Sequence, residues 1–157
     1  MPVTVRKAVR NDAARVAEFA VALFELHAGW NPRRFTQIAT AEKAAWFYGD
    51  RADHGSVLVA ELDGEVIGFA YCEYEPTLYA ELATNVLWLH DIYVEPDERG
   101  HGAGDALIEA VSAEGKRLGA NKVLLSVAVQ NAEGHRLFER NGFEMTMHEM
   151  MLAIDNE

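Results

Sequence analysis

The sequence predicts an α/β domain built around a mixed β-sheet. Two apolar segments flank Asp63-Gly64, the preferred residue pair of a tight hairpin turn, and so predict antiparallel strands. A glycine-rich segment, 99–104, separates an apolar strand from an amphipathic helix, an arrangement typical of a crossover to a parallel strand. The predicted element order is β, α, α, β, β, β, α, β, α, β. Because hairpins and crossovers coexist, the sheet is expected to contain both kinds of pairing.

Length and composition indicate one domain over residues 1–157. Its 157 residues are enough to bury a hydrophobic core, and no repeat or linker divides them. Cys72 is the one cysteine, so no disulfide can form within the chain. No apolar run approaches the roughly 20 residues that span a bilayer, and the first residues lack a secretory pattern. We therefore expect a cytoplasmic protein without a membrane partner.

The net charge of −11 restricts the classes of partner. Nucleic-acid binding depends on clustered Lys and Arg, so we expect no nucleic acid. An acidic surface suits a cationic substrate such as an amine, although the charge is explained equally well by solubility alone.

The first third of the chain predicts one strand and two helices. Residues 3–9 alternate as a half-buried strand. Asn11 or Asp12 is placed as the N-cap of a helix that ends near Gly29. The apolar face of that helix comprises Val16, Phe19, Ala20, Leu23 and Phe24. A second helix is expected from about residue 40 to residue 48.

The middle of the chain predicts the hairpin and a further strand. The hairpin strands are 56–62 and 65–72, and 73–85 is interpreted as a long strand end with a loop. The next strand, 87–94, ends at Glu95-Pro96.

The last third predicts two helices and two strand regions. After the glycine-rich segment comes an amphipathic helix closed at Gly119. A buried strand is expected over 122–129, and Asn131 is placed as the cap of a short helix, 132–140. Residues 143–154 are expected to form a terminal strand or pair of strands.

The glycine-rich segment is suited to binding a pyrophosphate. Gly100, Gly102 and Gly104 alternate, so a bulky anion can approach the backbone closely. The following helix supplies free N–H groups and the positive end of its dipole, and Arg99 stands beside them. A dinucleotide fingerprint needs Gly at position 105, which is Asp, and a P-loop needs a Gly-Lys-Ser/Thr ending that is missing.

Two blocks of sequence resemble the Gcn5-related N-acetyltransferase (GNAT) family. Residues 89–96 with 99–104 are similar to its acetyl-CoA signature, and residues 131–132 with 137–143 to its second block. The resemblance implies a three-layer domain and a mixed, mostly antiparallel sheet. In that sheet a splayed parallel pair of strands, 92–94 and 122–129, binds CoA.

The resemblance also implies which residues contact acetyl-CoA. An N–H near Ile92 is expected to polarise the thioester, and the amides of 100–105 to hold the pyrophosphate. Asn131 matches a residue that contacts the cofactor arm, although capping its helix explains it equally well. The cofactor-binding set is Ile92, Tyr93, Val94, Arg99, Gly100, His101, Gly102, Ala103, Gly104, Asp105, Asn131 and Phe138.

The catalytic candidates are His90 and Asp91. His90 matches the place of a glutamate base in several relatives, although a hydrogen-bonded histidine without a catalytic part explains it too. Adjacent strand residues face opposite ways, so only one of the two, preferably His90, is expected to face the cleft. Phe138 stands where the family often has a tyrosine acid, and a phenyl ring cannot donate a proton. Thiolate release is then left to water, Tyr93 or Ser126.

The acceptor site is expected between the first two helices and beside the segment before the cofactor strand. Trp30, Phe35, Glu73 and Glu75 are its candidates, because aromatic and carboxylate groups together suit an alkylammonium group. An ordinary loop and sheet edge remains the alternative. The histidines show no metal-ligand spacing, so no metal is expected.

The resemblance therefore implies an acetyl-CoA-dependent N-acetyltransferase that acts on a primary amine of a small molecule. Acetylation of a protein N-terminus or lysine is an alternative activity. A protein of another class, a CoA-binding sensor that has lost turnover, is a further alternative. It is suggested by Phe138, which replaces the tyrosine that often serves as the acid in the family. Dimers are common in the family, so a homodimer is one of the expected states.

Overall fold

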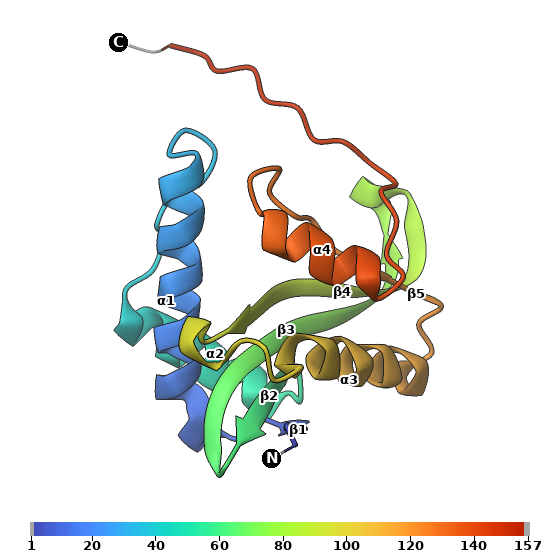
Figure 1. The fold of residues 1–157 in the computed structure, drawn as a ribbon. Helices are drawn as coiled ribbons and strands as arrows, with labels where there is room; N and C mark the ends of the chain where they lie inside the picture. The colour runs from blue at the N-terminus through green and yellow to red at the C-terminus, as the bar shows by residue number, and fades with distance from the viewer. Residues whose placement is uncertain (1, 156–157) are drawn as a thin grey trace.

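The computed structural model describes residues 2–155, which form five strands and four α-helices around one sheet (Figure 1). The strands are β1 (Thr4–Lys7), β2 (Val57–Leu62), β3 (Glu65–Leu78), β4 (Ala83–Val94) and β5 (Lys122–Leu124). The helices are α1 (Ala13–Trp30), α2 (Ala41–Asp53), α3 (Ala103–Leu118) and α4 (Ala132–Arg140). In the described residues, no helix has the length and apolar character needed to cross a bilayer.

The sheet has the order β1-β2-β3-β4-β5 and is mixed, as predicted. The first three pairings are antiparallel, and β4 pairs with β5 in parallel through the α3 crossover. The predicted hairpin turn is confirmed, since Asp63 and Gly64 both have positive φ, 53° and 80°. The 73–85 region extends β3 to Leu78, so that β3 and β4 form a long hairpin.

Two hydrophobic cores make the domain three layers deep (Figure 1). On one face of the sheet, α1 and α2 bury Val16, Phe19 and Tyr48 against β2 and β3. On the other face, α3 buries Leu107 and Val111. Apolar residues of the central strands β2 and β3 alternate between these faces, so both faces of the sheet need a helical layer to cover them.

Helix ends largely follow the sequence signals. The side chain of Asn131 accepts a hydrogen bond from Gly134 N and caps α4, as predicted. Gly119 closes α3 in the left-handed conformation. Asp12 lies at the N-cap of α1, but its side chain accepts from Val9 N and Arg6 and does not cap that helix.

A β-bulge interrupts the long hairpin at the middle of β4. Tyr71 is opposite Asp91, whereas the next residue of β3, Cys72, is opposite Leu89. His90 is therefore an additional residue in β4 without a partner in β3. An extra residue changes which face the following side chains occupy.

The parallel pair separates after a short stretch. Only 86–88 of β4 pair with 122–124 of β5, so the predicted strand 122–129 is too long by five residues. Residues 89–92 of β4 and 125–127 then lie on opposite walls of a cavity. The splayed pair that the family resemblance implies is present.

The prediction of a terminal strand or pair of strands over 143–154 is wrong. The described residues 143–155 belong to no strand or helix and run away from the sheet as an extended segment (Figure 1). The alternation of apolar residues predicted a strand, but a strand also needs a neighbouring strand, and residues 2–155 place none beside the segment.

Candidate functional site

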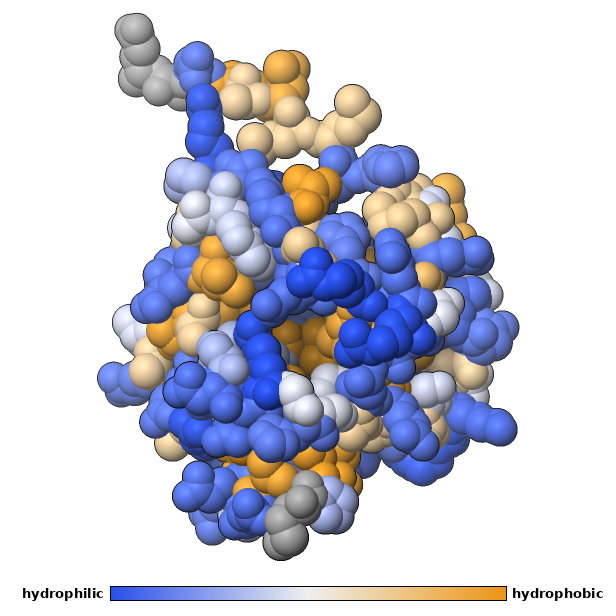
Figure 2. Space-filling view, viewed as in Figure 1, coloured by the Kyte–Doolittle hydropathy of each residue, from blue (hydrophilic) through white to orange (hydrophobic). Residues whose placement is uncertain are grey.

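A cavity of about 470 Å³ opens where β4 and β5 separate. Its walls come from α1, from the loop after α1, from β4, from the chain after β5 and from α4. Figure 2 shows a hollow on this face with an apolar floor and a hydrophilic rim. The lining residues are Leu23, Phe24, His27, Arg34, Phe35, Thr36, Ile38, Leu89, His90, Asp91, Ile92, Leu125, Ser126, Val127, Asn131 and Phe138.

His90 and Asp91 both line this cavity, so the prediction that only one of them would face it is wrong. His90 stacks on Tyr71, with ring centroids 5.0 Å apart. Asp91 accepts a 2.6 Å hydrogen bond from the hydroxyl of Tyr48. Tyr48 and Tyr71 both belong to the core beneath α1 and α2, whereas the flanking Leu89 packs on the α3 face. The bulge at His90 breaks the alternation and turns both side chains to one side.

Burial favours the uncharged form of both His90 and Asp91, and neighbouring groups oppose this effect. Burial lowers the pKa of His90, an effect that the nearby Asp91, Glu73 and Glu75 partly oppose. Burial raises the pKa of Asp91, and the hydrogen bond from Tyr48 opposes that rise. The pKa of Tyr48 is itself raised by burial and by Asp91, so its hydroxyl keeps its proton and donates. A neutral His90 can accept a proton at neutral pH.

The structure adds a histidine that sequence reasoning missed. His27 lies on α1 and lines the same cavity, with its ring at 4.9 Å from the ring of Phe35. Its Nδ1 is 2.8 Å from the carbonyl oxygen of Leu23. A carbonyl can only accept, so Nδ1 carries the hydrogen and the neutral ring keeps its lone pair on Nε2. The sequence did contain a signal for this residue: position 27 lies four residues after Leu23 and so continues the apolar face of the helix.

The glycine-rich segment has the geometry expected of an anion-binding loop. Gly100 and Gly102 have φ of +93° and +80°, and a Cβ on either would meet nothing within 4 Å. The first hydrogen bond of α3 runs from Ala106 N to Gly102 O. The amides before Ala106 therefore have no partner within the helix and are available to an anion.

Gly104 serves a different purpose from the other two glycines. A Cβ at this position would lie 3.2 Å from both Cδ atoms of Leu137, so the glycine lets α3 and α4 pack closely. Asp105 reinforces the contact by accepting hydrogen bonds from Arg140 and Asn141 of the α4 end. The third glycine is thus explained by helix packing.

The remaining cofactor candidates lie partly on the cavity and partly outside it. Ile92, Asn131 and Phe138 line it. Arg99 donates to Val94 O and to Glu133 of α4, and so connects the glycine-rich segment to the helix that carries Phe138. Tyr93, by contrast, packs against Phe19 beneath α1, with ring centroids 5.6 Å apart.

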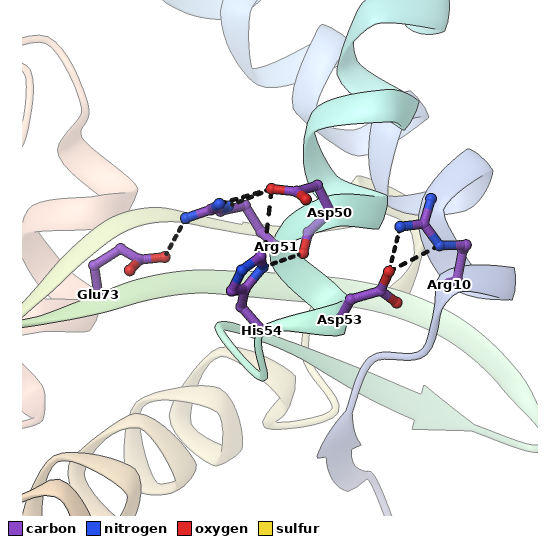
Figure 3. A network of polar contacts seen from close by, with 6 residues as sticks. All are labelled: Arg10, Asp50, Arg51, Asp53, His54 and Glu73. Atoms are coloured by element: carbon purple, nitrogen blue, oxygen red, sulfur yellow. Dashed lines mark hydrogen bonds and ion pairs between the residues drawn. The ribbon is translucent and has the colours of Figure 1, made fainter.

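The acceptor candidates are only partly brought together. Phe35 lines the cavity, whereas Trp30, Glu73 and Glu75 are not among its lining residues. Trp30 packs edge-on against His27, which does line the cavity. The carboxylate of Glu73 faces Arg51 of α2 at 3.6 Å, within a surface network that also holds Asp50 and His54 (Figure 3).

The residues present fit acetyl-CoA. The separated strands leave the edge of residues 89–92 beside the cavity, where an extended amide-bearing arm could pair with backbone groups. Beyond it, the open Gly100 and Gly102 leave room for a pyrophosphate at the start of α3.

Comparison with known proteins agrees with this geometry. The model of the Acetyltransferase (GNAT) family matches residues 20–143. The chain is 28% identical to an uncharacterized N-acetyltransferase of Methanocaldococcus jannaschii over 90% of this chain and 60% of that protein, so it spans less than two thirds of this relative. It is also 28% identical to the L-methionine sulfoximine/L-methionine sulfone acetyltransferase of Salmonella typhimurium, over 91% of this chain and 81% of that one.

A solved structure has the same fold. The aminoglycoside N-acetyltransferase AAC(6′)-Iy in complex with CoA superposes with a TM-score of 0.77 at 18% identity, covering 97% of this chain and 94% of that chain. The family model covers most of the sequence, and the cavity lies at the splayed strands. The chain therefore belongs to the GNAT family of acetyltransferases.

Proposed function

We propose that the chain transfers the acetyl group of acetyl-CoA to a primary amine of a small molecule. The observation that carries this proposal is the cavity between the separated strands, which His90 and Asp91 of β4 both line. Its volume of about 470 Å³ lies within the range of small-molecule sites, roughly 300–1,000 Å³. The relatives named above that act on methionine sulfoximine and aminoglycosides support an acceptor of this size.

The residues divide the chemistry among them. The amine nitrogen attacks the thioester carbonyl, the carbon–sulfur bond breaks and CoA leaves as a thiolate. Neutral His90 takes the proton that the acceptor ammonium must lose before its nitrogen can attack, directly or through water. A backbone N–H near Ile92 stabilises the negative oxygen, and the amides of residues 100–105 hold the pyrophosphate.

Asp91 has a separate part in this proposal. Its carboxylate is held by the Tyr48 hydroxyl and faces the cavity beside His90. A carboxylate there attracts the cationic acceptor and orients its nitrogen toward the base. Phe138 lines the cavity without a hydroxyl, so the thiolate takes its proton from solvent water, directly or relayed through the hydroxyl of Ser126, which also lines the cavity.

Two measurements test the proposal. Acetyl-CoA at millimolar concentration should raise the melting temperature, whereas NAD and ATP should not. Release of free thiol should then be followed with a panel that contains amino-acid sulfones, aminoglycosides, a polyamine and a peptide N-terminus. Turnover with a small amine supports the proposal. Turnover with the peptide alone assigns a protein acceptor, and a melting shift without turnover assigns a CoA-binding sensor.

A further inference from the structure

The cavity has one permanently charged cation and one carboxylate in its walls. Within residues 2–155, Arg34 is the one lysine or arginine among the lining residues, and Asp91 is the one aspartate or glutamate. Asp91 lies on β4, whereas Arg34 lies on the loop that follows α1. In the proposed reaction Asp91 attracts the ammonium group of the acceptor, which leaves Arg34 without a part. A guanidinium in the wall of a ligand cavity favours a ligand that also carries an anionic group.

The loop after α1 holds Arg34 in a defined position. The side-chain oxygen of Asn31 accepts hydrogen bonds from the amides of Arg33 and Arg34, at 3.2 Å and 3.3 Å. The guanidinium of Arg34 lies over the ring of Phe35, with its Cζ atom 4.8 Å from the ring centroid, and Phe35 also lines the cavity. Because the backbone and the side chain are both held, a ligand that binds here orders little that is not already ordered.

A carboxylate of the chain itself pairs with this guanidinium. Nε and Nη2 of Arg34 donate to the two carboxylate oxygens of Glu149, and the Nη2 bond is 3.0 Å long. This is the two-pronged contact that a planar guanidinium makes with a planar carboxylate, and it lowers the pKa of Glu149. The side chains are 41% and 62% exposed, and exposed ion pairs stabilise little, so the carboxylate of a ligand can replace that of Glu149.

The remaining walls describe the body of the ligand. Leu23 and Phe24 of α1, Ile38 of the following loop and Leu89 of β4 line the same cavity as Arg34 and present hydrocarbon to it. Apolar walls with a few polar groups bind a ligand whose body is apolar and whose polar groups are few. The cavity is therefore suited to a hydrocarbon body that carries one ammonium group and one carboxylate.

We propose that the acceptor is an amino acid with an apolar body, whose ammonium group binds at Asp91 and whose carboxylate binds at Arg34. This inference rests on the proposed function, because it names the acceptor of the same reaction. Arg34 determines specificity: it contacts the acceptor away from the reacting nitrogen and exchanges no proton with it. Such a contact is equally strong before and during acetyl transfer, so its loss should raise KM and leave kcat unchanged.

Calorimetric titration of the CoA-saturated protein tests the carboxylate without any turnover. Leucine, γ-aminobutyrate and ε-aminocaproate are each compared with the corresponding primary amide, which keeps the amine and the body but loses the negative charge. At least one of the acids should bind about tenfold more tightly than its amide, as expected for a hydrogen bond between charged groups. In Arg34→Gln the acid and its amide should bind equally well, because the substitution removes the one partner that distinguishes them.

Two matched variants separate recognition from the surface ion pairs. Arg33→Gln changes the neighbouring arginine, which is 58% exposed, pairs with Asp155 and is not among the lining residues. Glu149→Gln removes the Arg34–Glu149 pair from its other side. Both variants should keep the preference for the acid. With acetyl-CoA present, Arg34→Gln should raise the KM of the preferred acid about tenfold and change kcat by less than about twofold.

The outcomes distinguish this proposal from the proposed activity. It is overturned if every acid binds no more tightly than its amide, or if Arg34→Gln keeps the preference. It is also overturned if Glu149→Gln loses the preference as Arg34→Gln does, because the effect then belongs to the ion pair. Selective binding of an acid without thiol release from acetyl-CoA supports the carboxylate site and contradicts acetyl transfer. Turnover of amines without a preference for acids supports acetyl transfer and contradicts the carboxylate site.

Discussion

The hydroxyl of Tyr48 on α2 donates a 2.6 Å hydrogen bond to Oδ2 of Asp91 on β4. This contact joins the helical layer to the bulged strand at the wall of the cavity. Burial raises the pKa of Asp91 and also that of Tyr48. The Tyr48 hydroxyl therefore keeps its proton, and the hydrogen bond that it donates stabilises the charged form of the Asp91 carboxylate. A polar contact between α2 and the sheet thus supports the wall of the cavity.

Replacement Tyr48→Phe should destabilise the fold and raise the pKa of Asp91 further. The phenyl ring keeps the packing in the core but removes the donor, which leaves a part-buried carboxylate unpaired at a cost of about 1–3 kcal/mol. Denaturant unfolding at pH 7 measures the loss. Tyr79→Phe is the control, since Tyr79 is 87% exposed and its variant should unfold like the wild type. Equal stabilities for Tyr48→Phe and the wild type would show that the contact is unimportant.

Replacement His90→Gln should lower kcat by about 100-fold, the lower range for loss of a general base. Because burial lowers the pKa of His90, the wild-type acid limb of kcat/KM should lie below the ordinary histidine range, and it should disappear in the variant. Acetyl-CoA should still raise the melting temperature. His54→Gln, an exposed histidine of the Figure 3 network, serves as the control with an unchanged profile. An intact acid limb in His90→Gln would refute the assignment of the base.

Gly102→Ala should weaken acetyl-CoA binding at least tenfold, because it strains the left-handed backbone and narrows the approach to the free amides. Gly64→Ala is the matched control: it has the same φ of +80° and the same open surroundings, but it lies in the hairpin turn. The two variants should lose similar stability in thermal unfolding, and only Gly102→Ala should lose affinity. A similar loss of affinity in both would assign the effect to backbone strain in general.

Gly104→Ala is expected to act on stability. Its Cβ would press on Leu137 of α4 at 3.2 Å, so the α3–α4 contact must shift. The melting temperature should fall even without acetyl-CoA, because the hydrogen bonds from Arg140 and Asn141 to Asp105 should also weaken. If the stability is unchanged and the affinity for acetyl-CoA is lost, Gly104 belongs with the glycines that bind the pyrophosphate, and the packing explanation is wrong.

Glu114→Gln should cost stability at neutral pH but not in strong acid. Hydrogen bonds from Arg117 and Lys7 lower the pKa of Glu114 to about 2, so the folded state binds its proton less tightly than the unfolded state. The stabilisation is present above the unfolded pKa and disappears as the pH falls toward 2, and we expect about 1 kcal/mol at pH 7 after solvent screening. Unfolding free energies of both chains from pH 7 to pH 2 should converge. A difference that is constant across this range would contradict the ion-pair explanation.

The local elements could be predicted because their signals are local. The turn at Asp63-Gly64, the cap at Asn131 and the closure at Gly119 each follow from what a few neighbouring residues allow. The position of the glycine-rich loop followed in the same way. The boundaries that failed, such as the overlong strand 122–129, depend on where a neighbouring strand ends.

The sequence by itself therefore determined the order of elements as far as α4, the mixed sheet and the loop at the start of α3. Only the tertiary structure decided that His90 and Asp91 share one face, because a bulge is a mismatch between two strands and no single strand encodes it. It likewise decided that Gly104 faces Leu137 and that His27 joins the cavity, since both contacts unite residues distant in sequence. The 143–155 segment shows the same division: its alternation is local, but a strand forms only beside a neighbouring strand, and residues 2–155 place none there.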